Sequence, residues 1–193
     1  YLVVVHPSFP GKSFVELTAY AKNNPLNFGV SGLGTTIHLG AAWIAQATRA
    51  NIVIVPYKGT GPALNDLLGA QIHATFANIL NVVPHIKTGR VKAIGVTATA
   101  RVPLGPDWPT VSETMPGFTA SNWVGVAAPA GTPRNITALL SREIGGALNE
   151  PSFRERLPHL DIAPGTPEAF EKMMRAELEK WARVVKATGA RLD

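Results

Sequence analysis

The stretch Asn27–Gln46, NFGVSGLGTTIHLGAAWIAQ, decides the expected fold because it joins three local patterns. Phe28–Val30 is apolar and strand-like, Ser31–Thr36 is a turn that contains two glycines, and Thr36–Thr48 has helical periodicity. A strand that passes through a glycine turn into a helix is the building unit of parallel α/β sheets. The start of such a helix exposes unpaired amide groups, which suit a carboxylate or a phosphate.

The same strand–turn–helix unit recurs through the first half of the chain. Strands are predicted at 2–5, 28–30, 52–55, 72–76 and 91–96, and helices at 13–22, 36–48, 62–69 and 79–87. Alternation with short connections predicts an α/β fold in which a parallel sheet is covered by helices on both faces. A proline-rich surface connection with a short helix at 111–114 follows.

The remaining sequence is mainly helical and lacks a sheet of its own. It predicts a strand at 123–127 and helices at 133–149, 151–157 and 167–188. One face of the last helix collects the apolar side chains Phe170, Met174, Leu178, Trp181 and Val185. We therefore expect two lobes. Residues 6–121 form a self-contained lobe, and residues 1–5 with 122–193 form a remnant of the other lobe, including the crossover strands.

The composition excludes several classes of protein. A hydrophobic fraction of 46% supports a packed core, and the absence of cysteine excludes disulfides, thiol nucleophiles and cysteine-based metal sites. The net charge of +5 is dispersed, which favours solubility over nucleic-acid binding. We find no transmembrane run and no signal peptide. Because the chain opens on the strand-like YLVVVHP, we expect that an amino-terminal part is missing.

The Ser31–Thr36 turn is the first candidate anion site. It lacks the Gly-Lys-Ser/Thr of a P-loop, and Ile37 stands where a dinucleotide-binding fingerprint needs its third glycine. The groups that remain for an anion belong to Ser31, Gly32, Gly34, Thr35 and Thr36. The alternative is that Thr35 or Thr36 caps the helix and the glycines serve only the turn.

Two further junctions lie at the same edge of the predicted sheet. The stretch VPYKGTGPA leads from a strand into a helix through Lys58, Gly59, Thr60 and Gly61, and Lys58 adds a cation. Asn78 follows the next strand, where it either caps the next helix or donates its amide to a ligand. The carboxyl edge of an open α/β sheet is where such folds bind ligands.

The residues give no support for catalysis. The histidines are scattered, no pair has the i,i+4 spacing of a metal site, and no G-x-S-x-G elbow is present. His38, inside the helix after the glycine turn, is expected to be packed or exposed. Asp66 and Glu113 are single carboxylates beside turns, so no general acid–base pair is predicted. We predict no catalytic residue, no metal ligand and no cofactor.

Five motifs in order resemble one family: VSGLGTTIHL, VPYKGTGPALNDLLGAQIHATFANI, PHIKTGRVKAIGVT, WPTVSETMPGF and WVGVAAPAGTP. Together they are similar to the Bug, or TctC-like, periplasmic solute-binding proteins, the extracytoplasmic receptors of tripartite tricarboxylate transporters. The resemblance covers essentially all of the chain. It implies a two-lobed periplasmic-binding-protein fold, capture of a small organic carboxylate in the cleft, membrane transporter subunits as partners, a periplasmic location and no catalysis.

The resemblance also assigns residues to the cleft. It matches the family's cleft loop to Ser31–Thr36, its second turn to Tyr57–Ala63, its next cleft-edge segment to Asn78, and its crossover to Trp123. Many relatives carry aspartate where Ala77 stands, which argues against an amino-acid ligand.

One region of the family has no counterpart in this sequence. The amino-terminal part of its first lobe, with a Pro-Gly-Gly loop, is absent, so we expect residues 122–193 to associate with something, self-association included. Two other hypotheses stay open: an interaction module without a ligand and, with less support, an enzyme that acts on a phosphorylated substrate.

Overall fold

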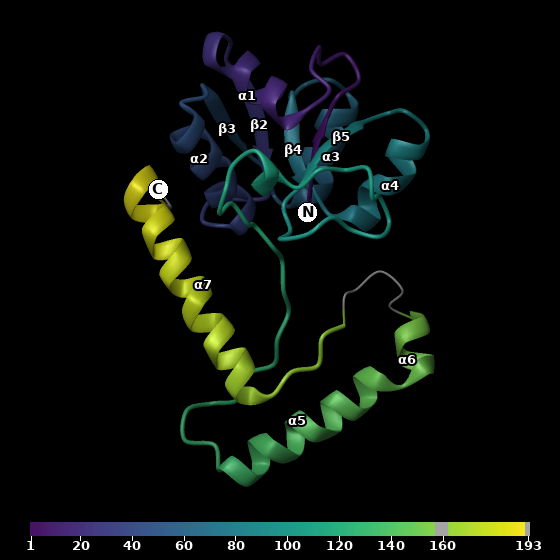
Figure 1. Ribbon diagram of the computed structural model, residues 1–193, viewed down its shortest axis with the longest axis vertical. Helices are drawn as coiled ribbons and strands as arrows, with labels where there is room; N and C mark the ends of the chain where they lie inside the picture. The colour runs from purple at the N-terminus through teal and green to yellow at the C-terminus, as the bar shows by residue number, and fades with distance from the viewer. Residues whose placement is uncertain (157–161, 192–193) are drawn as a thin grey trace. The chain divides into compact units, whose positions relative to one another are not determined.

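The computed structural model describes residues 1–156 and 162–191, which belong to two compact units (Figure 1). Unit 1 comprises Tyr1–Asn122 together with Arg183–Asp193, and unit 2 comprises Trp123–Ala182. The two units differ in construction, because unit 1 contains the whole sheet and unit 2 is built from helices and extended segments.

Unit 1 is organised around one five-stranded sheet with the order β3-β2-β4-β1-β5. The strands are β1 (Leu2–Val5), β2 (Leu26–Val30), β3 (Ile52–Pro56), β4 (Ala74–Ala77) and β5 (Lys92–Val96). Strand β2 pairs in parallel with both β3 and β4, as the alternating pattern predicts. The predicted α/β class is confirmed.

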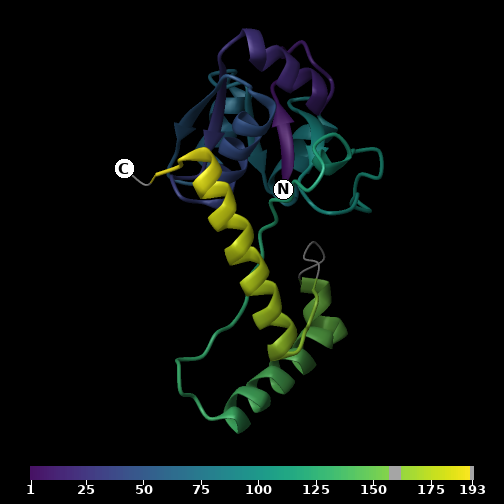
Figure 2. The same ribbon diagram turned by 60° about the vertical axis from the view of Figure 1, so that its left-hand side comes forward.

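Strand β1 departs from the prediction of an all-parallel sheet. It lies between β4 and β5 and runs antiparallel to both, with Leu2 opposite Ala77 and Val96 (Figure 1, Figure 2). Its four side chains are fully buried, so residues 1–5 lie in the sheet of unit 1 rather than apart with residues 122–193. The alternation of strands and helices does not reveal which strands are neighbours. Because β1 runs antiparallel to β4, and β4 runs parallel to β2, the handedness rule for connections between parallel strands does not apply to the connection from β1 to β2.

The helices of unit 1 begin and end close to the predicted residues. They are α1 (Phe14–Asn23), α2 (Thr36–Thr48), α3 (Thr60–Leu68), α4 (Ile79–Lys87) and the 3₁₀ turn Val111–Glu113. Helix α1 shows why these predictions succeeded. The Ser13 hydroxyl accepts the Glu16 amide at 3.2 Å, and the Glu16 carboxylate accepts the Lys12 amide at 2.6 Å. Such signals are local, so the sequence alone reveals them.

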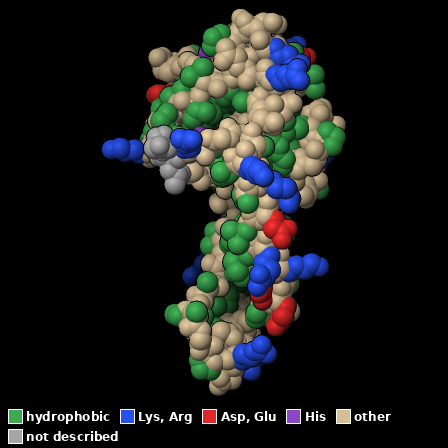
Figure 3. All heavy atoms as spheres, turned by 90° about the vertical axis from the view of Figure 1, so that its left-hand side faces the viewer, with side chains coloured by type: hydrophobic (Ala, Val, Ile, Leu, Met, Phe, Trp, Pro, Cys, Tyr) green, Lys and Arg blue, Asp and Glu red, His purple; other side chains and the backbone are tan. Residues whose placement is uncertain are grey.

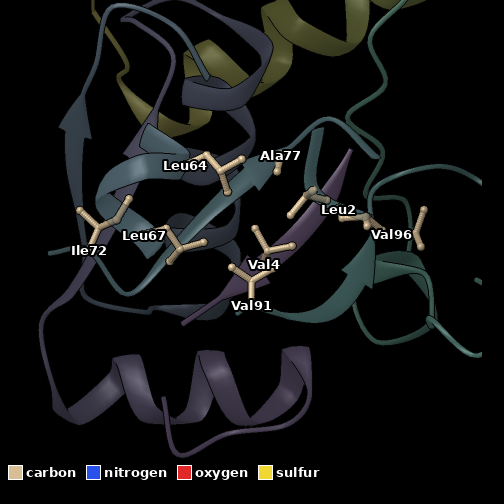
Figure 4. Close-up of a cluster of buried hydrophobic side chains, with 9 residues drawn as sticks. Leu2, Val4, Leu64, Leu67, Ile72, Ala77, Val91 and Val96 are labelled. Carbon is tan, nitrogen blue, oxygen red and sulfur yellow. The ribbon is translucent and has the colours of Figure 1, made fainter. Parts of the chain in front are cut away.

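Helices cover both faces of the sheet, as predicted. On one face, Leu2 and Val4 of β1 pack with Leu64 and Leu67 of α3 and with Val82 of α4 (Figure 4). The other face contains an aromatic cluster. The Phe76 ring is 5.0 Å from the Phe28 ring and 6.4 Å from the Phe118 ring, measured between centroids. Helix α2 approaches this cluster at Gly40, where an added Cβ would lie 2.7 Å from Cε2 of Phe76.

The proline-rich connection after β5 is tied to the sheet by hydrogen bonds and one ion pair. Thr97 donates its amide to the Tyr1 carbonyl at 3.0 Å, and Ala120 donates to the Thr97 carbonyl at 3.0 Å. Arg101 and Glu113 form a bidentate pair, with Nη2 to Oε2 at 2.7 Å and Nε to Oε1 at 2.9 Å. Glu113, which the sequence presents as a lone carboxylate beside a turn, therefore forms an ion pair with Arg101.

The Glu113 carboxylate gives a pH-dependent prediction. Hydrogen bonds from Arg101, and then from the Thr110 amide, lower the pKa of Glu113 from 4.5 to about 2. Because the pKa is lower in the folded state, the stabilisation is complete above pH 4.5 and is lost as the pH falls toward 2. We expect the melting temperature of Glu113→Gln to fall less than that of the wild type across this interval. The difference should shrink in 1 M salt because the Arg101–Glu113 pair is exposed. The same decrease in melting temperature with pH in both proteins would contradict the attribution of this stabilisation to Glu113.

Unit 2 contains the helices α5 (Arg134–Asn149), α6 (Pro151–Arg156) and most of α7 (Pro167–Thr188). The predicted end of α6 at residue 157 lies outside the described residues. The prediction of a strand at 123–127 is wrong. The described residues of unit 2 contain no strand, so this segment has no neighbouring strand with which to pair. The segment packs on α7 instead. Trp123 contacts Phe170 edge-to-face at 5.5 Å, and an added Cβ at Gly125 would collide with the Phe170 ring.

The predicted buried face of α7 is not buried. Its side chains are half-buried or exposed, and Leu178 is 71% exposed. Val184 is the buried residue of this helix, and it belongs to the segment grouped with unit 1. Apolar side chains of α5 are also exposed, and Figure 3 shows hydrophobic atoms on the surface of the helical unit. Association of these faces with another chain or segment stays a prediction. None of the described helices combines the length and the apolarity needed to span a membrane.

Candidate binding site

Three helix N-termini follow three adjacent strands of the sheet. Strands β3, β2 and β4 are neighbours and run in parallel, so their carboxyl ends at Pro56, Val30 and Ala77 lie along one edge. Each strand leads through a short turn into a helix, α3, α2 and α4 respectively. The first amides of a helix carry partial positive charge and lack partners within the helix. This edge therefore collects the candidate groups that the sequence predicted in unit 1.

The turn between β2 and α2 is shaped by two glycines and one threonine. Gly32 has φ 128° and Gly34 has φ 74°, values that favour glycine. Thr35 caps α2, because its hydroxyl oxygen accepts the His38 amide at 3.3 Å and its hydroxyl group donates to the Gly32 carbonyl at 2.8 Å. Ser31 donates to Thr35 at 3.4 Å. The capping interpretation is thus confirmed for Thr35, whose hydroxyl proton is already used within the turn.

The amide of Gly34 also has a partner inside the protein. It donates to Nδ1 of His38 at 3.0 Å, and His38 is only 6% exposed. An Nδ1 that accepts carries no proton, so the ring is neutral and protonated on Nε2; burial also lowers the pKa of His38. The expectation that the Gly34 amide is free for a ligand is wrong. Within the described part of the chain, no residue accepts the amide of Thr36, which is partly exposed, whereas Ile37 is buried, so Thr36 offers the amide for an anion at this helix start.

In the second turn, Tyr57 supports the backbone. Its amide donates to the Val30 carbonyl at 2.8 Å. Its ring lies close to Gly29, where an added Cβ would be 3.3 Å from Cε2 of Tyr57. The hydroxyl donates to Oδ2 of Asp66 at 2.8 Å. Burial, and then this hydrogen bond, raise the pKa of Tyr57 to about 12. The Tyr57 hydroxyl is therefore hydrogen-bonded to α3. Asp66, which the sequence presents as a lone carboxylate beside a turn, accepts that hydrogen bond.

The start of α3 is more open than the start of α2. Gly59 is the N-cap residue with φ 111° and gives α3 no side-chain cap. An added Cβ at Gly59 or at Gly61 would meet no atom within 4 Å. Lys58 is exposed beside these glycines, and Thr60 is the first residue of the helix. Uncapped amides, unfilled space and a neighbouring cation occur together here.

Asn78 belongs to unit 1, whereas Trp123 belongs to unit 2. Asn78 is the N-cap residue of α4, but its side chain makes no capping hydrogen bond. Trp123 belongs to unit 2, where it contacts Phe170, and its place in a site stays a prediction. Among the described residues, no group of three or more metal-ligating side chains lies close together. A shallow surface hollow is lined by residues of α7 alone, most of them charged.

Reasoning from the sequence missed His38 and Asp66 as partners of the candidate residues. The signal for His38 was the spacing of four residues from Gly34, which lets a side chain in the first turn of a helix reach back to the preceding turn. The signal for Asp66 was weaker, because the contact between Tyr57 and Asp66 depends on how α3 packs against the end of β3.

The chain matches a family model, TctC, described as the tripartite tricarboxylate transporter family receptor, over residues 1–190. The chain belongs to the TctC family. It is 36% identical over 180 residues to a UPF0065 protein encoded in the tcbD-tcbE intergenic region of Pseudomonas sp. strain P51. It is 35% identical over 196 residues to protein BugT of Bordetella pertussis. These matches cover 90% and 99% of this chain but 54% and 60% of the relatives.

Solved structures of TctC-like proteins have the same fold. R. palustris Rpa4515 with adipate matches with a TM-score of 0.85 and 32% identity, covering 98% of this chain and 65% of the other. The periplasmic binding protein BugD gives 0.83 and 33%, with 98% and 66% coverage. MatC from Rhodopseudomonas palustris with bound malate gives 0.78 and 31%, with 95% and 65% coverage. The TctC chain thus spans over half the length of these relatives. The family is that of a transporter receptor, and BugD is a periplasmic binding protein; neither is an enzyme.

Proposed function

We propose that this TctC chain forms part of a periplasmic receptor that captures a small organic carboxylate and delivers it to membrane subunits of a tripartite tricarboxylate-type transporter. The start of α3 carries this proposal. It combines uncapped amides, open space at Gly59 and Gly61, and the exposed Lys58. A carboxylate placed there would gain charge-assisted hydrogen bonds at the positive end of the helix dipole.

A dicarboxylate suits the edge better than a single charge does. The Thr36 amide lies at the start of α2, and β2 and β3 are adjacent, so a second anion contact lies beside the first. Charge-assisted hydrogen bonds contribute roughly 1.5–3 kcal/mol each. A second carboxylate adds such bonds without a second loss of translational freedom. Adipate and malate, bound by two structural neighbours, have this chemistry.

The rest of the cleft is assigned to the other lobe. In this proposal, residues 6–121, together with β1 in their sheet, form the second lobe of the receptor, and Trp123 with the helices of unit 2 belongs to the first lobe. The ligand-facing set in the second lobe then consists of the Thr36 amide, the Lys58–Gly61 turn and the Asn78 side chain. Ala77 is buried and uncharged, so this edge offers no carboxylate at that position for the ammonium group of an amino acid.

Thermal stability in the presence of ligand tests the proposal. We expect adipate, malate or another dicarboxylate to raise the melting temperature, because a ligand that binds only the folded state stabilises it by about 2.7 kcal/mol at 100 times its dissociation constant. Dimethyl adipate, which keeps the chain but lacks the charges, should leave the melting temperature unchanged. If the diester and the diacid stabilise equally, or if no acid stabilises while phosphate esters do, the receptor function would be overturned.

A further inference from the structure

We propose that His38 is the positioning residue of the Ser31–Thr36 turn. Its neutral ring holds the turn in the shape that leaves the Thr36 amide free for an anion. The effect on ligand affinity rests on the proposed function, whereas the effect on the turn does not. The proposal starts from the hydrogen bonds that converge on this one residue.

His38 is linked to both glycines that shape the turn. Its Nδ1 accepts the amide of Gly34 at 3.0 Å. Its own amide donates to the hydroxyl oxygen of Thr35 at 3.3 Å, and that hydroxyl donates to the carbonyl of Gly32 at 2.8 Å. Both glycines have positive φ and no side chain that could restrict them. The conformation of the turn therefore depends on contacts made from the first turn of α2.

The ring of His38 can do this only while it is neutral. A protonated imidazole carries hydrogen on both nitrogens and cannot accept the Gly34 amide. Helix α2 packs on β2, β3, Phe76 of β4 and the segment 118–120, which contain no titratable side chain, and α2 itself contains none besides His38. The segment 183–191, grouped with the same unit, brings only the cations Arg183, Lys186 and Arg191. No carboxylate on these elements favours the charged form, so the turn stays intact at neutral pH and loosens in acid.

The proposal is tested by changing the acceptor without changing the helix. His38→Asn places an amide oxygen close to the position of Nδ1 and does not titrate. His38→Leu keeps an apolar side chain of similar size but has no acceptor. The matched control is His73→Leu, because Nδ1 of His73 accepts the Asn27 amide at 2.9 Å, a bond of the same kind at the other end of β2.

Amide NMR on the whole chain gives the direct result. We expect the Gly34 amide resonance of the wild type to titrate together with the His38 ring, with a midpoint below 6.5. In His38→Asn it should not titrate, and in His38→Leu its hydrogen exchange should be about tenfold faster, the equivalent of one hydrogen bond. His73→Leu should leave it as in the wild type. A Gly34 amide that neither titrates nor responds to His38→Leu would overturn the proposal.

Calorimetry with adipate and with malate extends the test to the ligand. We expect His38→Leu to bind about tenfold more weakly than the wild type, with His38→Asn within about threefold of it and His73→Leu unchanged. If the wild type binds neither these acids nor others, the proposed function fails, while the NMR result still decides the role of His38. If the wild type binds and all variants bind equally, His38 does not position the site.

Discussion

Phe76→Ala is expected to lower the free energy of unfolding of unit 1 by about 3–5 kcal/mol. Phe76 is fully buried in β4, and its ring contacts Phe28 edge-to-face at 5.0 Å. Helix α2 passes over it at Gly40, where space is lacking even for a methyl group. The surrounding helix and strands cannot collapse into the vacated volume without moving as units. The cost therefore includes the cavity as well as the lost apolar burial.

Urea unfolding followed by circular dichroism measures this loss. Phe76→Leu should cost less than Phe76→Ala, because leucine refills part of the volume. Phe153→Ala is the matched control: Phe153 lies in α6 of unit 2 and is partly exposed, so its removal should cost less than about 1 kcal/mol. Equal losses for Phe76→Ala and Phe153→Ala would show that the aromatic cluster is not the main core of this face.

The features that the sequence predicted correctly have local causes. Helix α2 begins after Thr35 and ends at Thr48 as expected, because a capping residue, a glycine turn and apolar periodicity all lie within its own stretch. The edge at which β2, β3 and β4 end also follows from local patterns, since each strand leads directly into a helix. Local signals thus sufficed to place most of the candidate residues at one edge.

The features that the sequence did not predict depend on contacts between distant elements. The direction of β1 depends on its pairing with β4 and β5, which begin 69 and 87 residues after Val5, the last residue of β1. The predicted strand at 123–127 would have needed a partner strand, and unit 2 has none in its described part. The Gly34 amide was expected to be free for a ligand because the sequence shows the glycine turn but not that the His38 ring accepts this amide. The position of the His38 ring had to be seen before that amide could be assigned.

Gly61→Leu is expected to reduce the affinity for a dicarboxylate at least tenfold with only a small change in stability. Gly61 is the second residue of α3, and an added Cβ would meet no atom within 4 Å outside its chain neighbours. Replacing a helical glycine removes an entropic cost of roughly 0.5–1 kcal/mol, but Pro62 follows directly and disfavours helical backbone at a residue with a Cβ, which offsets this gain. Because Cα–Cβ bonds tilt toward the helix N-terminus, the new side chain would cover the amides proposed to hold the carboxylate.

Comparison with Gly61→Ala makes this variant informative, because both variants place a Cβ before Pro62. A loss of affinity caused by the strain at Pro62 would be similar in both, whereas a loss caused by filling the binding site would be larger for leucine. Gly145→Leu in α5 is the matched control, because its added Cβ also meets open space but lies in unit 2. Calorimetry with adipate and thermal melting should be measured on both variants and on Gly61→Ala, whose affinity should lie between those of glycine and leucine. Unchanged affinity in Gly61→Leu would move the ligand away from α3 and leave the turn before α2 as the anion site on this edge.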